Sequence, residues 1–200
     1  MRKFLFSSPL VLILGALTTA FAASPASAAT VDTSNCVEQS FTQEFISYND
    51  NNWYAPVGGQ DSGGFNATGW TLSGGAAIVT TTLPDGSTGR VLDLPSKATA
   101  VSPVECVTSK YPVARGFVRN VKGGEGVSFN VEYEGTSTWD NMKNTGQIHG
   151  ANGAWEPSSQ VNLQPFKTGG WQPMRIVLVG KGTTSEFQVY DLELDPRLAH

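Results

Sequence analysis

The chain has 200 residues, of which 40% are hydrophobic and 15% are charged, with a formal net charge of −4. A chain of this length can form one hydrophobic core of ordinary size, so we expect a single domain. The acidic balance and the lack of a basic cluster argue against nucleic acid and anionic membranes as partners.

The N-terminus has the features of an export signal. Two basic residues precede an apolar run that is densest at 10–17, and an A-x-A cleavage site ends at Ala28. We therefore assign 1–28 to a signal peptide and 29–200 to one secreted domain. The mature sequence has no apolar run long enough to cross a bilayer, so we expect no membrane insertion.

Two cysteines follow, Cys36 and Cys106. An even pair in an exported protein predicts one disulfide, and the alternative is two free thiols. No further cysteine or suitably spaced histidine supports a zinc site.

The mature sequence reads as short strands separated by turn residues. The clearest strand has Val127, Phe129, Val131 and Tyr133 on one face, with polar residues between them. No convincing helical segment is present, so the pattern predicts an all-β antiparallel sandwich. Further strands are expected at 69–72, 76–82, 89–94, 100–107, 114–120, 159–164, 174–180 and 186–194.

The connections between these strands also carry predictions. The glycine-rich stretch "NVKGGEG" lies between 114–120 and 127–133 and predicts a hairpin of these two strands. Two stretches, 49–69 and 139–159, read as long irregular loops, which are uncommon in compact domains unless they are functional or mobile.

The order of the motifs "GWTLSGGAAIV", "GRVLDLP", "YPVARGFVRN", "VSFNVEY", "MRIVLVG" and "FQVYDLELDP" resembles a known family. Bacterial carbohydrate-binding modules of the galactose-binding-like and CBM4-9-like kind have similar motifs in this order. More similar still are secreted bacterial jelly-roll proteins of unassigned function. The resemblance covers most of 43–196 and implies a β-jelly-roll sandwich. It does not by itself imply sugar binding, because this architecture hosts many functions.

The closing stretch "FQVYDLELDP" places Asp191, Glu193 and Asp195 at i, i+2 and i+4. On a regular strand these carboxylates share one face. They could be catalytic acids, metal ligands or the polar side of an ordinary strand. Catalysis is disfavoured, since the acids of a β-sandwich glycosidase line a central cleft, whereas Pro196 ends this strand.

The resemblance further implies a structural Ca²⁺ near this last strand. Asp191 stands where the family has a ligating acid, and Asp50, or alternatively Glu44, would be its partner in the N-terminal segment. Ile46 stands where the family has an acid after the first-strand Phe. Two carboxylates supplemented by backbone carbonyls could bind Ca²⁺.

Aromatic residues in the polar stretches are candidates for a ligand site. A sugar ring presents an apolar face and several hydroxyl groups, so it is recognised by aromatic faces with polar groups around them. Trp53, Tyr54, Trp139 and Trp155 are the predicted platform, and Tyr133 is a candidate for the concave sheet face. The alternative for each is that it pins its loop against the sandwich.

The sequence therefore predicts an exported, non-catalytic module that binds polysaccharide or a cell-surface glycan, with Ca²⁺ as the one expected cofactor. The alternative is a structural or protein-interaction protein without a small ligand. A hydrolase that uses the terminal carboxylates is a third, weaker hypothesis. No protein partner is identified by the sequence.

Overall fold

The computed structural model describes residues 40–108, 110, 112–134, 139, 141–165 and 171–196. The predicted signal peptide and Cys36 lie outside these residues. Cys106 is buried in the strand Glu105–Thr108, and its disulfide with Cys36 stays a prediction.

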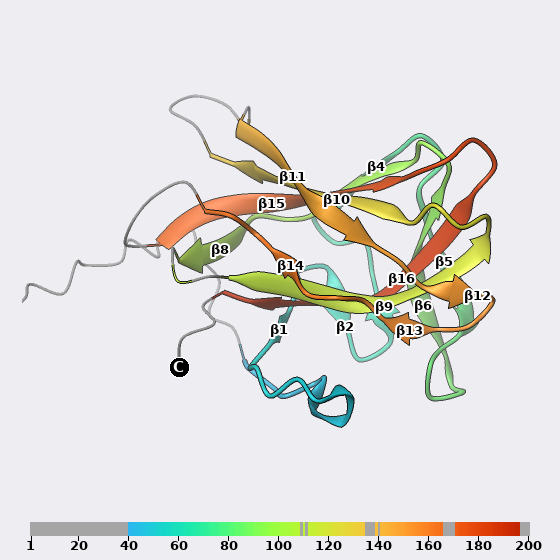
Figure 1. Cartoon of the computed structure of the whole chain (residues 1–200), viewed down its shortest axis with the longest axis horizontal. Helices are drawn as coiled ribbons and strands as arrows, with labels where there is room; N and C mark the ends of the chain where they lie inside the picture. Colours follow the sequence, from blue (N-terminus) through green and yellow to red (C-terminus); the bar gives the residue numbers. More distant parts are fainter. Residues whose placement is uncertain are drawn as a thin grey trace, which may run out of the picture.

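The described residues form two β-sheets and one short 3-10 turn, η1 (Ile46–Tyr48). The larger sheet, at the bottom of Figure 1, has the order β12-β9-β16-β6-β3-β2, with β1, β5, β13 and β14 paired at its sides. The smaller sheet has the order β11-β10-β15-β7-β4, and β8 also pairs with β15. The strands are β1 Ala55–Pro56, β2 Gln60–Asp61, β3 Gly64–Phe65, β4 Thr71–Ser73, β5 Ala77–Thr82, β6 Thr88–Pro95, β7 Thr99–Val101, β8 Glu105–Thr108, β9 Val113–Lys122, β10 Val127–Tyr133, β11 Asn141–Ile148, β12 Ala151–Asn152, β13 Glu156–Pro157, β14 Val161–Asn162, β15 Trp171–Gly180 and β16 Glu186–Asp195.

The core lies between the two sheets, as the alternating pattern predicts. Val127, Phe129, Val131 and Tyr133 of β10 are all at most 2% exposed and belong to one cluster. The facing side chains come from alternate positions of β6, β9 and β16 in the larger sheet. The all-β sandwich expected from the sequence is thus confirmed, because each sheet has an apolar face that only the other sheet covers.

The predicted hairpin of 114–120 with 127–133 is wrong. β9 pairs with β16 in the larger sheet, whereas β10 pairs with β11 and β15 in the smaller one. The glycine-rich stretch therefore carries the chain from one sheet to the other. Gly123 and Gly126 have φ of 75° and 83°, a conformation that glycine adopts readily, so the crossing can be tight.

The two predicted long loops also contain strands. β11 is an eight-residue strand within 139–159, paired with β10 along its whole length. It escaped prediction because its sequence, "NMKNTGQI", lacks apolar alternation. As an edge strand, it is held by backbone hydrogen bonds rather than by a buried face.

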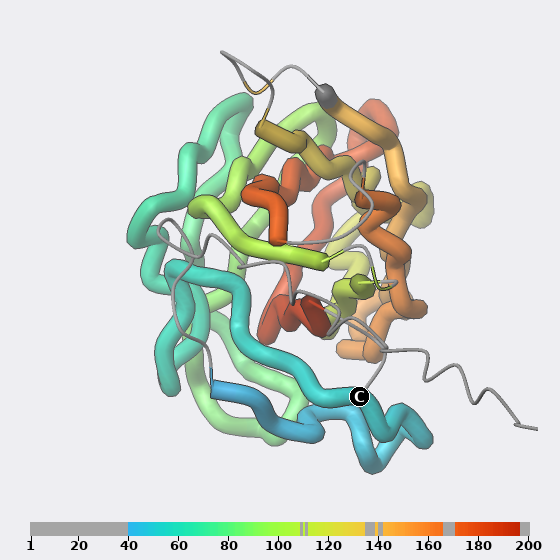
Figure 2. The backbone as a smooth tube through the Cα atoms, turned by 90° about the vertical axis from the view of Figure 1, so that its left-hand side faces the viewer, coloured from blue at the N-terminus to red at the C-terminus, as the bar shows by residue number. Residues whose placement is uncertain are grey.

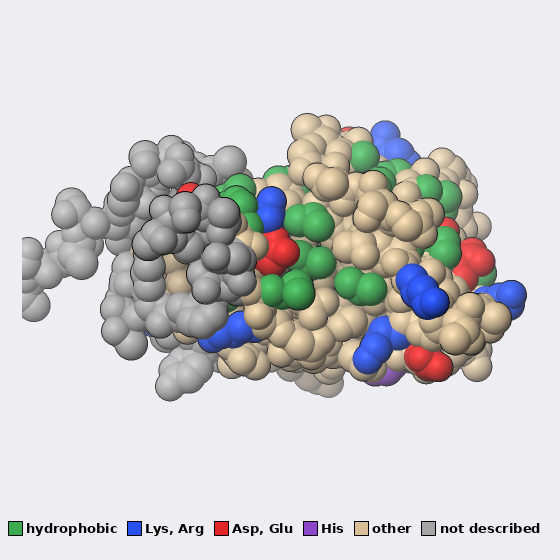
Figure 3. Space-filling view, turned by 90° about the horizontal axis from the view of Figure 1, so that it is seen from above, with side chains coloured by type: hydrophobic (Ala, Val, Ile, Leu, Met, Phe, Trp, Pro, Cys, Tyr) green, Lys and Arg blue, Asp and Glu red, His purple; other side chains and the backbone are tan. Residues whose placement is uncertain are grey.

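Charged side chains are scattered among uncharged ones on the described part of the smaller sheet's outer surface (Figure 3). Among the described residues, no helix has the length and apolar character to cross a membrane.

Candidate functional site

The N-terminal segment (residues 40–54) lies across the outer face of the larger sheet, seen in blue along the lower side of Figures 1 and 2. Phe45 and Tyr54 of this segment pack with Val113 and Phe117 of β9, and all four side chains are buried. The ring centroid of Phe45 lies 5.2 Å from that of Tyr54 and 5.5 Å from that of Phe117. The segment thus covers apolar side chains that alternation along β9 turns away from the core.

Asp50 anchors this segment to the sheet. Its Oδ2 accepts hydrogen bonds from Arg115 Nη1 at 2.6 Å, Tyr54 OH at 2.7 Å and Gln160 Nε2 at 2.9 Å. Its Oδ1 accepts one from the backbone N–H of Asn52 at 3.1 Å. Burial alone would raise the pKa of Asp50, but the bonds from Gln160, Tyr54 and Arg115 outweigh it and lower the pKa. This carboxylate is therefore fully engaged by protein donors.

A β-bulge in β16 decides where the terminal carboxylates point. Phe187 and Val189 face the core, but so do Leu192 and Leu194, so the inward positions shift by one residue along the strand. The register with β9 shifts between Tyr190 and Glu193. The extra residue is Asp191, whose φ of 50° lies in the left-handed region. In a regular strand Asp191 would face the core together with Phe187 and Val189. Because of the bulge, Asp191 does not face the core.

Gln60 holds the bulge in place. Its Nε2 donates to the backbone carbonyl of Leu192 at 2.7 Å, and its Oε1 accepts from the Leu192 N–H at 3.1 Å. The same Nε2 also donates to the carbonyl of Val57 at 2.9 Å. A side-chain amide thus replaces the neighbouring strand's backbone where the bulge interrupts the ladder.

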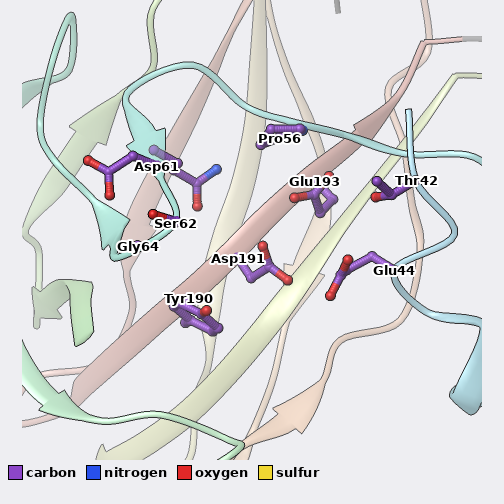
Figure 4. Close-up of a pocket in the computed structure, with 10 residues that line it drawn as sticks. Thr42, Glu44, Pro56, Asp61, Ser62, Gly64, Tyr190, Asp191 and Glu193 are labelled. Atoms are coloured by element: carbon purple, nitrogen blue, oxygen red, sulfur yellow. The ribbon is translucent and has the colours of Figure 1, made fainter. Parts of the chain in front are cut away.

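Beside the bulge lies a pocket of about 300 Å³ (Figure 4). Its walls come from the N-terminal segment, from the β1–β3 region and from β16, which meet only in the folded chain. Three acidic side chains, Glu44, Asp191 and Glu193, lie along one side of it in Figure 4, and Tyr190 lies below them. The lining residues are Thr42, Glu44, Pro56, Gln60, Asp61, Ser62, Gly64, Tyr190, Asp191 and Glu193.

Two of these acids, Asp191 and Glu193, lie two residues apart on β16. Glu193 is 3% exposed and Asp191 is half-buried, so their like charges repel in partly desolvated surroundings. Burial, then repulsion from Asp191, raises the pKa of Glu193 to about 10. Burial also raises the pKa of Asp191, to about 6, and Glu44 adds further repulsion. Both raised pKa values oppose full ionisation of the pair.

An aromatic row runs over the same sheet face and passes beside the pocket. It consists of Tyr48, Phe117, Tyr190 and Trp155, whose successive ring centroids are 5.6, 6.4 and 6.2 Å apart. Tyr48 is 45% exposed, Tyr190 and Trp155 are half-buried, and Phe117 is buried beneath the row. Tyr190 also lines the pocket, so it joins the aromatic surface to the acidic side chains.

Polar side chains lie beside the Trp155 end of the aromatic row. Arg119 donates to Gln188 Oε1 and, at 2.8 Å, to Thr81 Oγ1, while Gln188 Nε2 donates to Asp93 Oδ1 at 3.0 Å. The Arg119 guanidinium also lies 4.9 Å from the ring centroid of Trp155. This face therefore combines aromatic surfaces with fixed hydrogen-bonding groups.

The structure separates the aromatic residues that the sequence grouped together. Tyr54 and Tyr133 are 0% and 2% exposed, so neither offers a ring face to a ligand. Tyr133 lies in the core and donates to the carbonyl of Leu163. Their burial could not be read from the sequence, because the residues that cover them are distant along the chain.

The three predicted tryptophans lie apart from one another. Trp53 is 44% exposed on the N-terminal segment. Trp139 packs against Arg175 of β15, whose guanidinium carbon is 4.4 Å from its ring centroid, on the smaller sheet. Trp155 belongs to the aromatic row on the larger sheet, and its Nε1 donates to the carbonyl of Thr82 at 2.8 Å. Of the predicted platform, only Trp155 joins the row.

Three members of the site were not predicted as ligand-binding residues: Tyr48, Phe117 and Tyr190. For Tyr190 a sequence signal existed, since it stands where apolar residues change from odd to even positions in "FQVYDLELDP". That change indicates a bulge, and bulges often occur beside sites. Tyr48 and Phe117 carry no such signal.

The predicted Ca²⁺ ligands Asp50 and Asp191 are placed in different surroundings. Asp50 is engaged by Arg115, while Asp191 lines the pocket with Glu193. Within the described ranges, no three Asp, Glu, His or Cys side chains are arranged to hold a metal ion. Ca²⁺ requires six to eight oxygens at about 2.3–2.6 Å, so the described residues do not fit it well, and Ca²⁺ stays a prediction.

No protein-family model matches this chain, and no curated protein matches it in sequence. Similar solved structures are carbohydrate-binding modules, as the sequence resemblance predicted. One is a family 16 module (TM-score 0.43, 11% identity, 70% of this chain and 97% of that chain). Another is the family 11 module from Clostridium thermocellum in complex with a β-1,3-1,4-mixed-linked tetrasaccharide (0.40, 12%, 74% and 96%). A third is a xylan-binding domain of Paenibacillus barcinonensis Xyn10C (0.39, 15%, 66% and 88%). At these scores the likeness identifies no ligand, so function has to be argued from the site.

Proposed function

We propose that the protein is a secreted, non-catalytic β-sandwich module that binds polysaccharide or a cell-surface glycan on the outer face of its larger sheet. The observation that carries this proposal is the position of Tyr190, which belongs to an aromatic row and also lines a pocket of about 300 Å³. A pocket with an aromatic wall and a small number of polar groups directed into it is the usual form of a small-ligand site.

The chemistry of the face suits a sugar chain. The half-buried rings of Tyr190 and Trp155 offer apolar surface to the C–H face of a pyranose. The indole N–H of Trp155 is already engaged by Thr82, so its orientation is fixed before a ligand binds. The half-buried Arg119 is held by hydrogen bonds to Gln188 and Thr81, so a hydroxyl group of the ligand would meet a preorganised donor.

Binding without catalysis is the better proposal for the acidic pair. Glycosidases use two carboxyl groups about 5–9 Å apart, with the scissile bond between them. Asp191 and Glu193 lie along the same side of the pocket, so a scissile bond bound there would not have one carboxyl group on each side of it. We therefore assign them a binding role.

A pull-down of the secreted chain on a panel of insoluble polysaccharides and bacterial cell walls tests this proposal. We expect retention on one substrate class, weakened by Tyr190→Ala and by Trp155→Ala. Trp139→Ala is the matched control, because it removes the same side chain from the smaller sheet. Equal loss in the control and the site variants, or no retention on any matrix, would contradict the proposal.

One observation favours the alternative of a structural or protein-interaction role. The Trp155 hydrogen bond to Thr82 attaches the β12–β13 connection to the end of β5, which is the loop-pinning role considered from the sequence. If Trp155→Ala lowers the melting temperature while glycan retention is absent in every form, this alternative is preferred.

A further inference from the structure

The pocket beside β16 has an excess of negative charge. Glu44, Asp191 and Glu193 form no salt bridge with any described residue. Arg90, whose partner Asp61 also lines the pocket, and Arg115 are already paired, Arg90 with Asp61 and Arg115 with Asp50. Arg115 is the backbone partner of Glu193 across β9 and β16, yet its guanidinium is directed to Asp50. The described residues therefore leave this charge without a cationic partner.

Glu193 gives a second, independent sign of a missing partner. Glu193 is 3% exposed and lines the pocket, and its Oε2 has no hydrogen-bond partner among the residues that the structure describes. A buried carboxylate oxygen without a donor costs about 1–3 kcal/mol or more. Such a cost is offset when a ligand supplies the donor, so the pocket is built to accept one.

The arrangement of the pocket decides which donor fits best. A metal ion would need more oxygen ligands than these side chains bring together in the described residues. A neutral hydroxyl would supply one donor and no charge. A primary ammonium supplies three donors and a positive charge, so it can reach Asp191 and Glu193 at once. The ring of Tyr190 in the same pocket adds a favourable surface for a cation.

We propose that this pocket binds the protonated amine of an amino sugar, so that the ligand is a glycan with free amino groups, such as a polymer of glucosamine. This inference rests on the proposed glycan-binding function and specifies its substrate class. The sugar ring would lie on Tyr190 and Trp155, and the ammonium would lie between Asp191 and Glu193. N-acetylation of the sugar would remove both the charge and two of the three donors.

The test compares two hexasaccharides with the same backbone, one of glucosamine and one of N-acetylglucosamine, by isothermal titration calorimetry on the secreted chain. We expect the free-amine hexamer to bind about tenfold or more tightly. Glu193→Gln and Asp191→Asn should each reduce this preference. Glu125→Gln is the matched control, since Glu125 is exposed at the turn between β9 and β10 and far along the chain from β16.

Each other outcome overturns a defined part of the proposal. Equal or tighter binding of the acetylated hexamer would refute the amine specificity and leave glycan binding intact. If neither hexamer nor any polysaccharide binds, the proposed function itself fails. If polylysine binds as well as the free-amine hexamer, the acidic surface attracts any cation and no sugar site exists. If Ca²⁺ binds without sugar and Glu193→Gln abolishes it, the occupant is a metal ion.

Discussion

Replacing Glu193 by Gln should stabilise the protein at neutral pH. In the unfolded chain this carboxyl is ionised above its ordinary pKa of 4.5, whereas in the fold burial and Asp191 raise its pKa to about 10. Folding at pH 7 must therefore bind a proton. This stabilising contribution is fully present below about pH 4.5 and is lost as pH rises toward 10. From 4.5 to 7 the loss is about 2.5 pH units at about 1.4 kcal/mol each, or roughly 3–4 kcal/mol.

The variant avoids this loss because an amide does not titrate, and it keeps a donor that can face Asp191. We expect its gain in unfolding free energy to be near zero at about pH 4.5 and to approach roughly 3–4 kcal/mol at pH 7. Urea denaturation followed by tryptophan fluorescence, at several pH values between about 5 and 9, measures both curves. Glu125→Gln, an exposed control, should follow the wild-type curve. If the Glu193 variant also followed it, the carboxyl would not be buried beside Asp191 as described, and the reasoning would be refuted.

Three further predictions concern the supports of the site. Tyr54→Phe removes the hydroxyl that donates to Asp50, and should lower the unfolding free energy by about 1–2 kcal/mol in urea without changing glycan retention; reduced retention would show that this network does more than hold the segment. Gln60→Ala removes the hydrogen bonds that hold Leu192 at the bulge, and should weaken both stability, by about 2–3 kcal/mol, and ligand affinity. If only stability fell, the hydrogen bonds of Gln60 to Leu192 would not be needed to position the residues of the pocket. Reduction of the predicted disulfide of Cys106 should lower the melting temperature, with a loss of about 4 kcal/mol by chain entropy; a thiol assay that detects free cysteine in the native chain would contradict it.

The bulge at Asp191 shows the limit of pattern reading on this chain. The sequence places three carboxylates at alternate positions, and a regular strand would give them one face. The fold requires Phe187 and Val189 inside, and then Leu192 and Leu194, so one residue has to leave the ladder. Gln60, which is 132 positions away from Leu192, satisfies the backbone N–H and C=O of Leu192 where the ladder is interrupted. A contact between residues so far apart in the chain leaves no pattern in the sequence around either residue.

The aromatic residues illustrate the same limit. Tyr54 and Trp155 look alike in sequence, since both are large rings in polar surroundings. Tyr54 is fully buried because it belongs to the cluster of Phe45, Val113 and Phe117, whereas Trp155 is half-buried on the same face. Exposure depends on what distant segments pack against a ring, so composition cannot decide between a platform and a core residue.

What the sequence determined by itself is local and periodic. Alternation at 127–133 defined an inward face of β10, because a strand turns successive side chains to opposite sides. It could not say which sheet that strand would join. The chain crosses between sheets after β9 instead of turning back on itself, because each sheet must bury its apolar face on the other. The tertiary structure alone brought Glu44, Tyr190 and Glu193 around one pocket, since these residues come from segments that meet only when the sandwich closes.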